Sequence, residues 1–171
     1  MEVTKAILPH FRQNHAGTII NISSMGGRVT FPTCSIYHAT KFAIEGFSES
    51  LAYELLPQNI QVKIVEPGST LSNFIAAVNF SADAAITVYD EFNKTALDNW
   101  SKNTDPLQST IEDVAEVIYT AATDQTDTLR YMAGRDTALY LGARQSKNDQ
   151  EYVEYMRNSF IPEVMETGKK L

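Results

Sequence analysis

The sequence predicts an α/β fold in which parallel strands alternate with helices. Two short runs rich in β-branched residues, Thr18–Ile22 and Gln61–Glu66, flank one long amphipathic segment, Ala39–Leu56. A strand, a helix and a second strand in this order are typical of the βαβ unit of a parallel sheet. The composition agrees, because 43% hydrophobic and 20% charged residues in a chain of 171 suit one soluble core.

The first two elements are a helix and a strand. Over Val3–Phe11 the apolar residues recur at spacings of three and four, which predicts a helix, although no capping residue precedes it. The pattern therefore indicates the later part of a helix. The run Thr18–Ile22 predicts a buried parallel strand that ends at Ser23 and Ser24.

The next pair of elements completes the βαβ unit. Residues Ala39–Leu56 carry an apolar side chain every four positions, which predicts a helix that lies on the sheet and ends at Pro57. That apolar stripe consists of Ala43, Phe47, Leu51 and Leu55. The following run, Gln61–Glu66, predicts a strand that ends at Pro67 and Gly68.

The pattern from residue 71 to 106 is less regular and indicates one or two helices. The aromatic residues of this region could line an apolar substrate site or form core or oligomer contacts. They are Phe74, Phe80, Tyr89, Phe92 and Trp100.

The last third of the chain contains three further elements. Thr110–Asp113 is a capping signal for a helix that carries Val114, Val117, Ile118 and Ala121. The run Arg130–Ala133 predicts a strand, and Gln150–Met156 predicts a helix. The sequence has no repeat and no linker that would separate a second domain.

Charge and cysteine content exclude several classes of protein. The net charge is −7 and no basic stripe occurs, so nucleic acid is not expected as a partner. The single cysteine, Cys34, can form no internal disulfide and matches no metal-ligand spacing, so we expect no metal and a cytoplasmic location. No segment approaches the ~20 apolar residues of a membrane span, so no membrane partner is expected.

Tyr37 and Lys41 form a candidate acid–base pair. Because they lie four residues apart in a helix, their side chains project from one face. A nearby ammonium stabilises a phenolate, so we expect Lys41 to lower the pKa of Tyr37 from its usual value near ~10. The turn through Gly26 and Gly27 could bring the Ser24 hydroxyl beside the phenol, where the two hydroxyls would hold a carbonyl oxygen.

Three segments together resemble the short-chain dehydrogenase/reductase family in order and spacing. They are Gly17–Ser24 (GTIINISS), Tyr37–Ala43 (YHATKFA), which begins thirteen positions after Ser24, and Val65–Gly68 (VEPG). The resemblance implies the C-terminal portion of a Rossmann-type doubly wound parallel sheet with flanking helices. Residues 1–171 would then be part of one NAD(P)-binding domain, without its first βαβ units.

The resemblance also implies a role for each candidate site residue. Ser24 would orient the substrate, Tyr37 would be the catalytic acid/base, and Lys41 would lower the pKa of Tyr37 and bind the nicotinamide ribose. The segment that would lie along the nicotinamide consists of Pro67, Gly68, Ser69 and Thr70.

The implied activity is hydride transfer between NAD or NADP and a small alcohol or carbonyl substrate. The family's Gly-rich turn after the first strand is absent from this sequence, so we expect the 171 residues alone to be inactive. The alternative is a shortened, catalytically incompetent family member that acts as a binding or dimerisation module. Because the family associates through the helices that correspond to Val3–Phe11 and Ala39–Leu56, we expect a homo-oligomer.

A serine hydrolase is the rival enzyme class. Ser24-Met25-Gly26 half-matches a nucleophile elbow, but Ile22 replaces the first glycine of that motif. The one histidine after Ser24 is His38, and no acid lies between the two residues to orient it. The hydrolase interpretation therefore fails on the order of residues along the chain.

Overall fold

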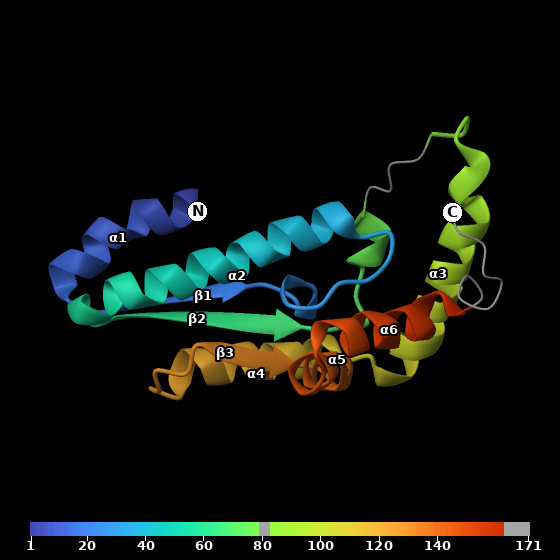
Figure 1. The fold of residues 1–171 in the computed structure, drawn as a ribbon. Helices are drawn as coiled ribbons and strands as arrows, with labels where there is room; N and C mark the ends of the chain where they lie inside the picture. The colour runs from blue at the N-terminus through green and yellow to red at the C-terminus, as the bar shows by residue number, and fades with distance from the viewer. Residues whose placement is uncertain (79–82, 163–171) are drawn as a thin grey trace.

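The computed structural model describes residues 1–78 and 83–162. Helices separate its strands along the chain, and the predicted α/β fold is confirmed (Figure 1). In chain order they are α1 (Glu2–Asn14), β1 (Gly17–Ile22), α2 (Ser35–Leu55), β2 (Ile60–Pro67), α3 (Asp90–Thr104), α4 (Ile111–Thr123), β3 (Arg130–Ala133), α5 (Arg135–Ser146) and α6 (Asp149–Phe160).

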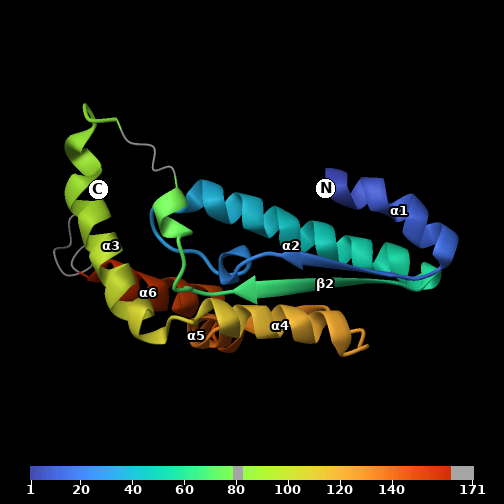
Figure 2. The same ribbon diagram turned by 180° about the vertical axis from the view of Figure 1, so that it is seen from behind.

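The described strands form one parallel sheet in the order β1-β2-β3. The register pairs Ile19 with Val62 and Val65 with Tyr131. Helix α2 connects β1 to β2, as predicted for a βαβ unit, and the short strand β3 joins the far side of β2. Helices α1 and α2 lie on one face of the sheet and α4 lies on the other (Figures 1 and 2).

Successive side chains of a strand point to opposite faces of the sheet, and here both faces receive apolar side chains. Ile19 faces α1 and α2, where it packs in a cluster with Leu51 and Leu55 of α2. Its neighbour Ile20 faces α4, in a cluster that contains Val65 of β2 and Ala121 of α4. This arrangement buries β2 almost completely and makes it the central strand.

A third apolar cluster lies beyond the carboxyl ends of the strands. Phe31 is its centre, and Trp100 of α3 and Phe160 of α6 pack on it with ring centroids at 4.4 and 5.5 Å. Trp100 is therefore a core contact, whereas Tyr89 is 57% exposed. Phe80, which the sequence offered for the same roles, lies outside the described residues.

Helix α2 differs from the prediction in its start and in its buried face. It begins at Ser35, four residues before the predicted start at Ala39. Ala43 is exposed, although the apolar spacing predicted it to lie on the sheet. The side chains that α2 buries are His38, Glu45, Ser48, Leu51 and Leu55, so the first half of the helix buries polar groups.

Strand β1 is less buried than predicted. It is an edge strand in the described sheet, and Ile22 at its end is 43% exposed. An unpaired edge leaves backbone groups and one side of the strand open. The run of β-branched residues indicated a strand correctly but did not indicate how many neighbours it has.

Helix α5 was not predicted from the sequence. Its buried side consists of Asp136, Thr137, Tyr140 and Leu141, so two of the four buried residues are polar. A search for apolar residues at helical spacing misses such a face. The same helix carries a carboxylate that matters for the site.

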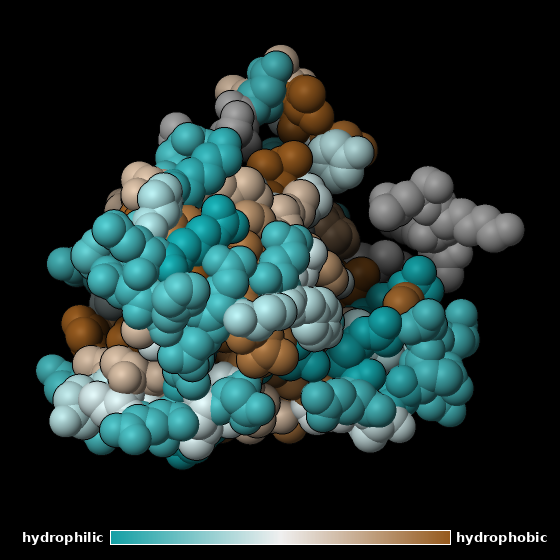
Figure 3. Space-filling view, turned by 90° about the vertical axis from the view of Figure 1, so that its left-hand side faces the viewer, coloured by the Kyte–Doolittle hydropathy of each residue, from teal (hydrophilic) through white to brown (hydrophobic). Residues whose placement is uncertain are grey.

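The described residues at the end of the molecule where β2 begins are mostly hydrophilic at the surface (Figure 3). Figure 3 views this end, which is the left-hand side of Figure 1, and hydrophilic residues cover most of it with hydrophobic ones scattered between them. None of the helices within residues 1–78 and 83–162 combines the length and apolarity that spanning a bilayer requires.

Candidate active site

Ser24 connects the carboxyl ends of two neighbouring strands. It follows β1 in an extended conformation, and its Oγ accepts a hydrogen bond from the Gly26 N–H at 3.0 Å. The same hydroxyl donates to the carbonyl of Pro67, the last residue of β2, at 3.3 Å. The Ser24 side chain is therefore held at the edge of the sheet where parallel strands present functional groups.

Tyr37 lies in the first turn of α2, directly above this turn. A Cβ atom at Gly26 would come within 3.0 Å of Tyr37 Cε1, so the glycine allows the backbone to approach the phenol ring. Phe74 lies on another side of the ring, with centroids 6.4 Å apart. Tyr37 is thus enclosed between the turn after β1 and the segment after β2.

The pKa of Tyr37 moves in the direction opposite to the sequence-based expectation. Burial of the phenol raises its pKa, and the side-chain interaction with Ser24 offsets part of this rise. Lys41 Nζ lies over the Tyr37 ring, 5.8 Å from its centre. Desolvation by burial is the largest influence on this pKa.

Lys41 is anchored to the end of β1. Its Nζ donates hydrogen bonds to the carbonyl oxygens of Ser23 at 2.9 Å and Ile22 at 3.3 Å. Burial lowers the pKa of Lys41, and the negative charge of Glu45 raises it. The ammonium has three N–H donors, so these two bonds leave one for a ligand.

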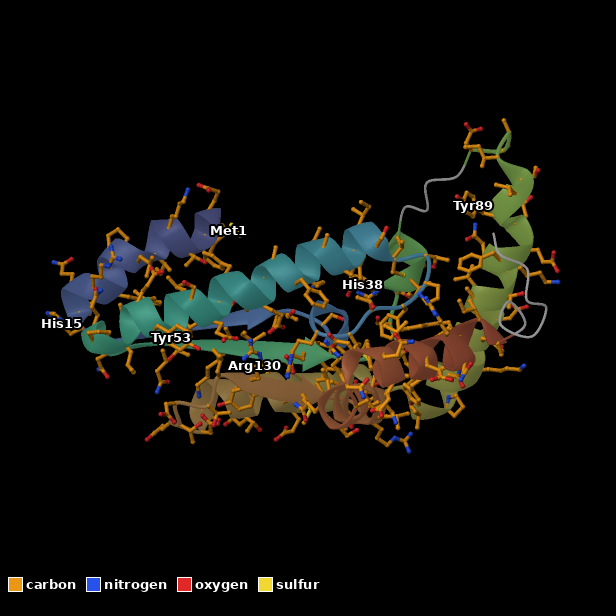
Figure 4. The ribbon with its side chains drawn as sticks, viewed as in Figure 1. Met1, His15, His38, Tyr53, Tyr89 and Arg130 are labelled. Carbon is orange, nitrogen blue, oxygen red and sulfur yellow. The ribbon has the colours of Figure 1, made fainter. Side chains whose placement is uncertain are left out.

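His38 fixes the turn on which Ser24 sits. Its Nε2 accepts a hydrogen bond from the Phe31 N–H at 2.9 Å, and its Nδ1 lies 2.7 Å from the Gly26 carbonyl oxygen. Figure 4 shows His38 at the N-terminal end of α2, and the residue is buried. Its role is structural, which agrees with the rejection of a hydrolase.

The segment Gly68–Thr70 is tied to α5 and to residue 109. The Ser69 N–H donates to Asp136 Oδ2 at 2.6 Å, and the Ser69 carbonyl accepts from the Ser109 N–H at 3.0 Å. A Cβ atom at Gly68 would collide with the Asp136 carboxylate. Thr70 Oγ1 donates back to the Gly68 carbonyl at 3.2 Å.

The structure brings part of the predicted site together. Ser24, Tyr37 and Lys41 lie around one volume, and Pro67 joins them through its carbonyl. Ser69 makes its hydrogen bonds with Asp136 of α5 and with Ser109, and Thr70 makes its side-chain bond within the loop, to Gly68.

Sequence reasoning missed Asp136, which is fully buried. Its position just after β3 was a usable signal, because functional side chains gather beyond the carboxyl ends of parallel strands. Burial raises the pKa of the Asp136 carboxyl, and hydrogen bonds from Ser69 and Thr137 backbone N–H groups oppose the rise. No comparable signal marked His38 as a structural residue.

The chain is similar to known proteins in sequence and in fold. The family model for short chain dehydrogenase matches residues 1–83. An uncharacterised oxidoreductase of Schizosaccharomyces pombe is 39% identical over 90% of this chain and 64% of its own length. An NADP-dependent 3-hydroxy acid dehydrogenase of the same yeast is 36% identical over 72% of this chain and 42% of its own length.

The fold is similar to that of a solved short-chain dehydrogenase from Streptomyces avermitilis. The TM-score is 0.65 and the identity 28%, over 98% of this chain and 57% of that one. The chain therefore spans between about two fifths and two thirds of the proteins named here. The family model, the yeast relatives and the shared fold all point to the short-chain dehydrogenase family, to which this chain is similar over most of its length.

Proposed function

We propose that the protein is an NAD(P)-dependent oxidoreductase that interconverts a small alcohol and the corresponding carbonyl compound. The observation that carries the proposal is the convergence of Ser24, Tyr37 and Lys41 beyond the carboxyl ends of β1 and β2. Two hydroxyls and an ammonium in one half-buried volume suit a reaction in which a substrate oxygen gains or loses a proton.

Tyr37 is the proton donor in the direction of carbonyl reduction. Because burial raises the pKa of its phenol, the hydroxyl keeps its proton at neutral pH and can donate it to a substrate oxygen. In alcohol oxidation the same oxygen must accept a proton, which requires a cation close to the phenolate. Lys41 is the cation on the same helix face, one turn away.

Ser24 orients the substrate. Its hydroxyl donates to the Pro67 carbonyl, so its hydrogen points along the edge of the sheet, where rotation about one bond redirects it to a substrate oxygen. The Gly26 N–H holds the Ser24 oxygen in place from the other side. A carbonyl held between Ser24 and Tyr37 would be polarised by two O–H donors.

The donor set fits a nicotinamide cofactor. The remaining N–H of Lys41 suits a ribose hydroxyl, and the half-buried segment from Pro67 to Thr70 borders the same volume. NAD or NADP, when bound, would supply or accept the hydride. The chain's own groups would bind the ribose, orient the substrate and move the proton at the Tyr37 oxygen.

The named relatives support an enzyme rather than a binding or dimerisation module. Both yeast relatives are described as an oxidoreductase or a dehydrogenase. We propose further that residues 1–171 form part of one cofactor-binding domain and that the protein is a cytoplasmic homo-oligomer. Exposed apolar side chains on α1 and α2, such as Val3 and Tyr53, support association through these helices.

The test is turnover by the protein as its gene encodes it, with both cofactors and a panel of alcohols and carbonyl compounds. Tyr37→Phe keeps the ring and removes the hydroxyl, so we expect turnover to fall by about 10²–10⁴-fold. Tyr53→Phe, on the same helix, is the matched control and should leave turnover unchanged. Near-normal turnover by Tyr37→Phe would remove Tyr37 from the mechanism. The same assay on residues 1–171 alone tests the expectation that they are inactive by themselves.

A further inference from the structure

A third ionisable side chain continues the helix face that carries Tyr37 and Lys41. Glu45 follows Lys41 by four residues in α2, so the two side chains are neighbours on the helix surface. The hydrogen bonds that Lys41 Nζ makes are to two neutral carbonyl oxygens, of Ile22 and Ser23. Within the described residues, the carboxylate whose charge acts on Lys41 is that of Glu45.

Glu45 is fixed in place from two sides. It is 5% exposed, and its Oε2 accepts a hydrogen bond from Arg130 Nε at 3.0 Å. On the other side, a Cβ atom at Gly27 would lie 2.8 Å from Glu45 Cγ and 3.1 Å from the Lys41 carbonyl oxygen. Gly27 therefore lies against both residues and allows the turn after β1 to pack on this part of α2.

The Glu45 carboxylate keeps part of its charge uncompensated. Its Oε1 is buried and makes no hydrogen bond with any described residue. Arg130, which lies close to β2 in Figure 4, forms ion pairs with Glu49 and Glu66 in addition to Glu45.

Three carboxylates, of Glu45, Glu49 and Glu66, and two guanidinium groups, of Arg28 and Arg130, meet in this cluster. Burial and the neighbouring Glu45 raise the pKa of the Glu66 carboxyl, which favours its neutral form. The carboxylate charge that acts on Lys41 is that of Glu45. Tyr37 is the remaining titratable group on this face of the helix, and burial raises its pKa further above neutral pH, so it adds no charge at pH 7.

We propose that Glu45 is a positioning residue that acts through Lys41 and keeps the Lys41 ammonium charged in the active site. Burial opposes the charge on Lys41 and the Glu45 carboxylate favours it, so the two residues act as a pair. The importance of this pair for catalysis rests on the proposed function. Its electrostatic effect on Lys41 does not, and it can be measured without any turnover.

The experiment is an NMR titration of the Lys41 side chain in the 171-residue chain, from pH 7 to pH 11. Glu45→Gln keeps the shape and removes the charge, and we expect it to lower the pKa of Lys41 by about one pH unit. Glu49→Gln is the matched control, because Glu49 also pairs with Arg130 but is partly exposed and lies two turns from Lys41. It should leave the pKa of Lys41 within about 0.2 pH units of the parent value.

Two further measurements keep the test decisive. Glu45→Asp retains a carboxylate and should restore at least half of the lost shift. If the protein has the proposed activity, the high-pH limb of its rate profile should move to lower pH in Glu45→Gln and stay in place in Glu49→Gln. If the protein as its gene encodes it shows no turnover while Lys41 shows the expected shift, the proposed function is refuted and the pairing stands.

An unchanged pKa of Lys41 in Glu45→Gln, or an equal change in Glu49→Gln, would overturn the proposal. Amide spectra typical of an unfolded chain for both Glu45 variants would assign Glu45 to the core alone and would overturn it as well.

Discussion

The imidazole of His38 spans the turn after β1, with Nδ1 2.7 Å from the carbonyl oxygen of Gly26. Its other nitrogen accepts the Phe31 N–H, so the proton of the neutral ring must sit on Nδ1 and point at Gly26. Protonation of Nε2 would turn it into a donor that faces the N–H of Phe31, so the hydrogen bond between them would be lost. Burial already lowers the pKa of His38, so the neutral form belongs to the folded state.

A pH-dependent loss of stability follows from this pairing. Because the folded chain binds the His38 proton more weakly than the unfolded chain, stability should fall as the pH drops below about 6.5 toward the lowered folded pKa. His38→Gln should be less stable by about 1–3 kcal/mol at pH 7.5 and should lose less between pH 7 and pH 5. Urea unfolding at pH 7 and pH 5 measures the loss of stability in each protein. An equal loss in the parent protein and in His38→Gln would contradict the prediction.

Lys41→Met tests the cofactor contact. Loss of a hydrogen bond from a charged group costs about 1.5–3 kcal/mol, so the dissociation constant for NADH or NADPH should rise by about 10- to 150-fold. Loss of the ammonium should also move the pH profile of turnover upward, because the phenolate loses its cation. Fluorescence titration of the bound nucleotide measures the affinity. A profile that stays in place would confine Lys41 to ribose binding.

Two glycine substitutions should act in opposite directions. Gly68→Ala would push a methyl group into the Asp136 carboxylate and should destabilise the fold and the loop from Pro67 to Thr70. Gly46→Ala is the control, because a Cβ atom there meets nothing within 4 Å and the site is an exposed helix interior. It should stabilise the protein by about 0.5–1 kcal/mol. Thermal unfolding of both variants checks the signs, and a stabilising Gly68→Ala would show that Asp136 can move.

Self-association should depend on the outer surfaces of α1 and α2. Val3 in α1 is 82% exposed and Tyr53 in α2 is 68% exposed, so a glutamate at both positions should shift the protein toward monomer. Tyr119→Glu is the control, since this side chain is 65% exposed on α4 at the other face of the sheet. Light scattering over a range of concentrations measures the mass. An unchanged oligomer in the double variant would exclude these two helices.

The order of most strands and helices could be predicted from the sequence. The spacing of the apolar residues indicates the type of each element, and capping residues, prolines and glycines mark where it begins or ends. The strand Arg130–Ala133 was predicted with its observed bounds, and Thr110 caps α4 in a capping box with Asp113. Both signals are local, so tertiary contacts change them little.

Other features depend on contacts between distant parts of the chain. Helix α5 was missed because Asp136 and Thr137 face inward, toward Ser69 on the loop after β2 and the Glu66 carbonyl in β2. The rise in the pKa of Tyr37 comes from burial, which the spacing between Tyr37 and Lys41 does not reveal. The same spacing did predict correctly that the two side chains share a face of α2.

The position of Trp100 makes the aromatic cluster beyond the sheet optically accessible. It is the single tryptophan of the chain, and its indole meets Phe31 edge-on at 4.4 Å and stacks on Phe160 at 5.8 Å. Emission excited at long ultraviolet wavelengths therefore comes from one known place. A red shift would report that α3 has left Phe31, the residue that also donates its backbone N–H to His38. The emission of Trp100 thus reports whether α3 is packed against the loop that leads into the candidate active site.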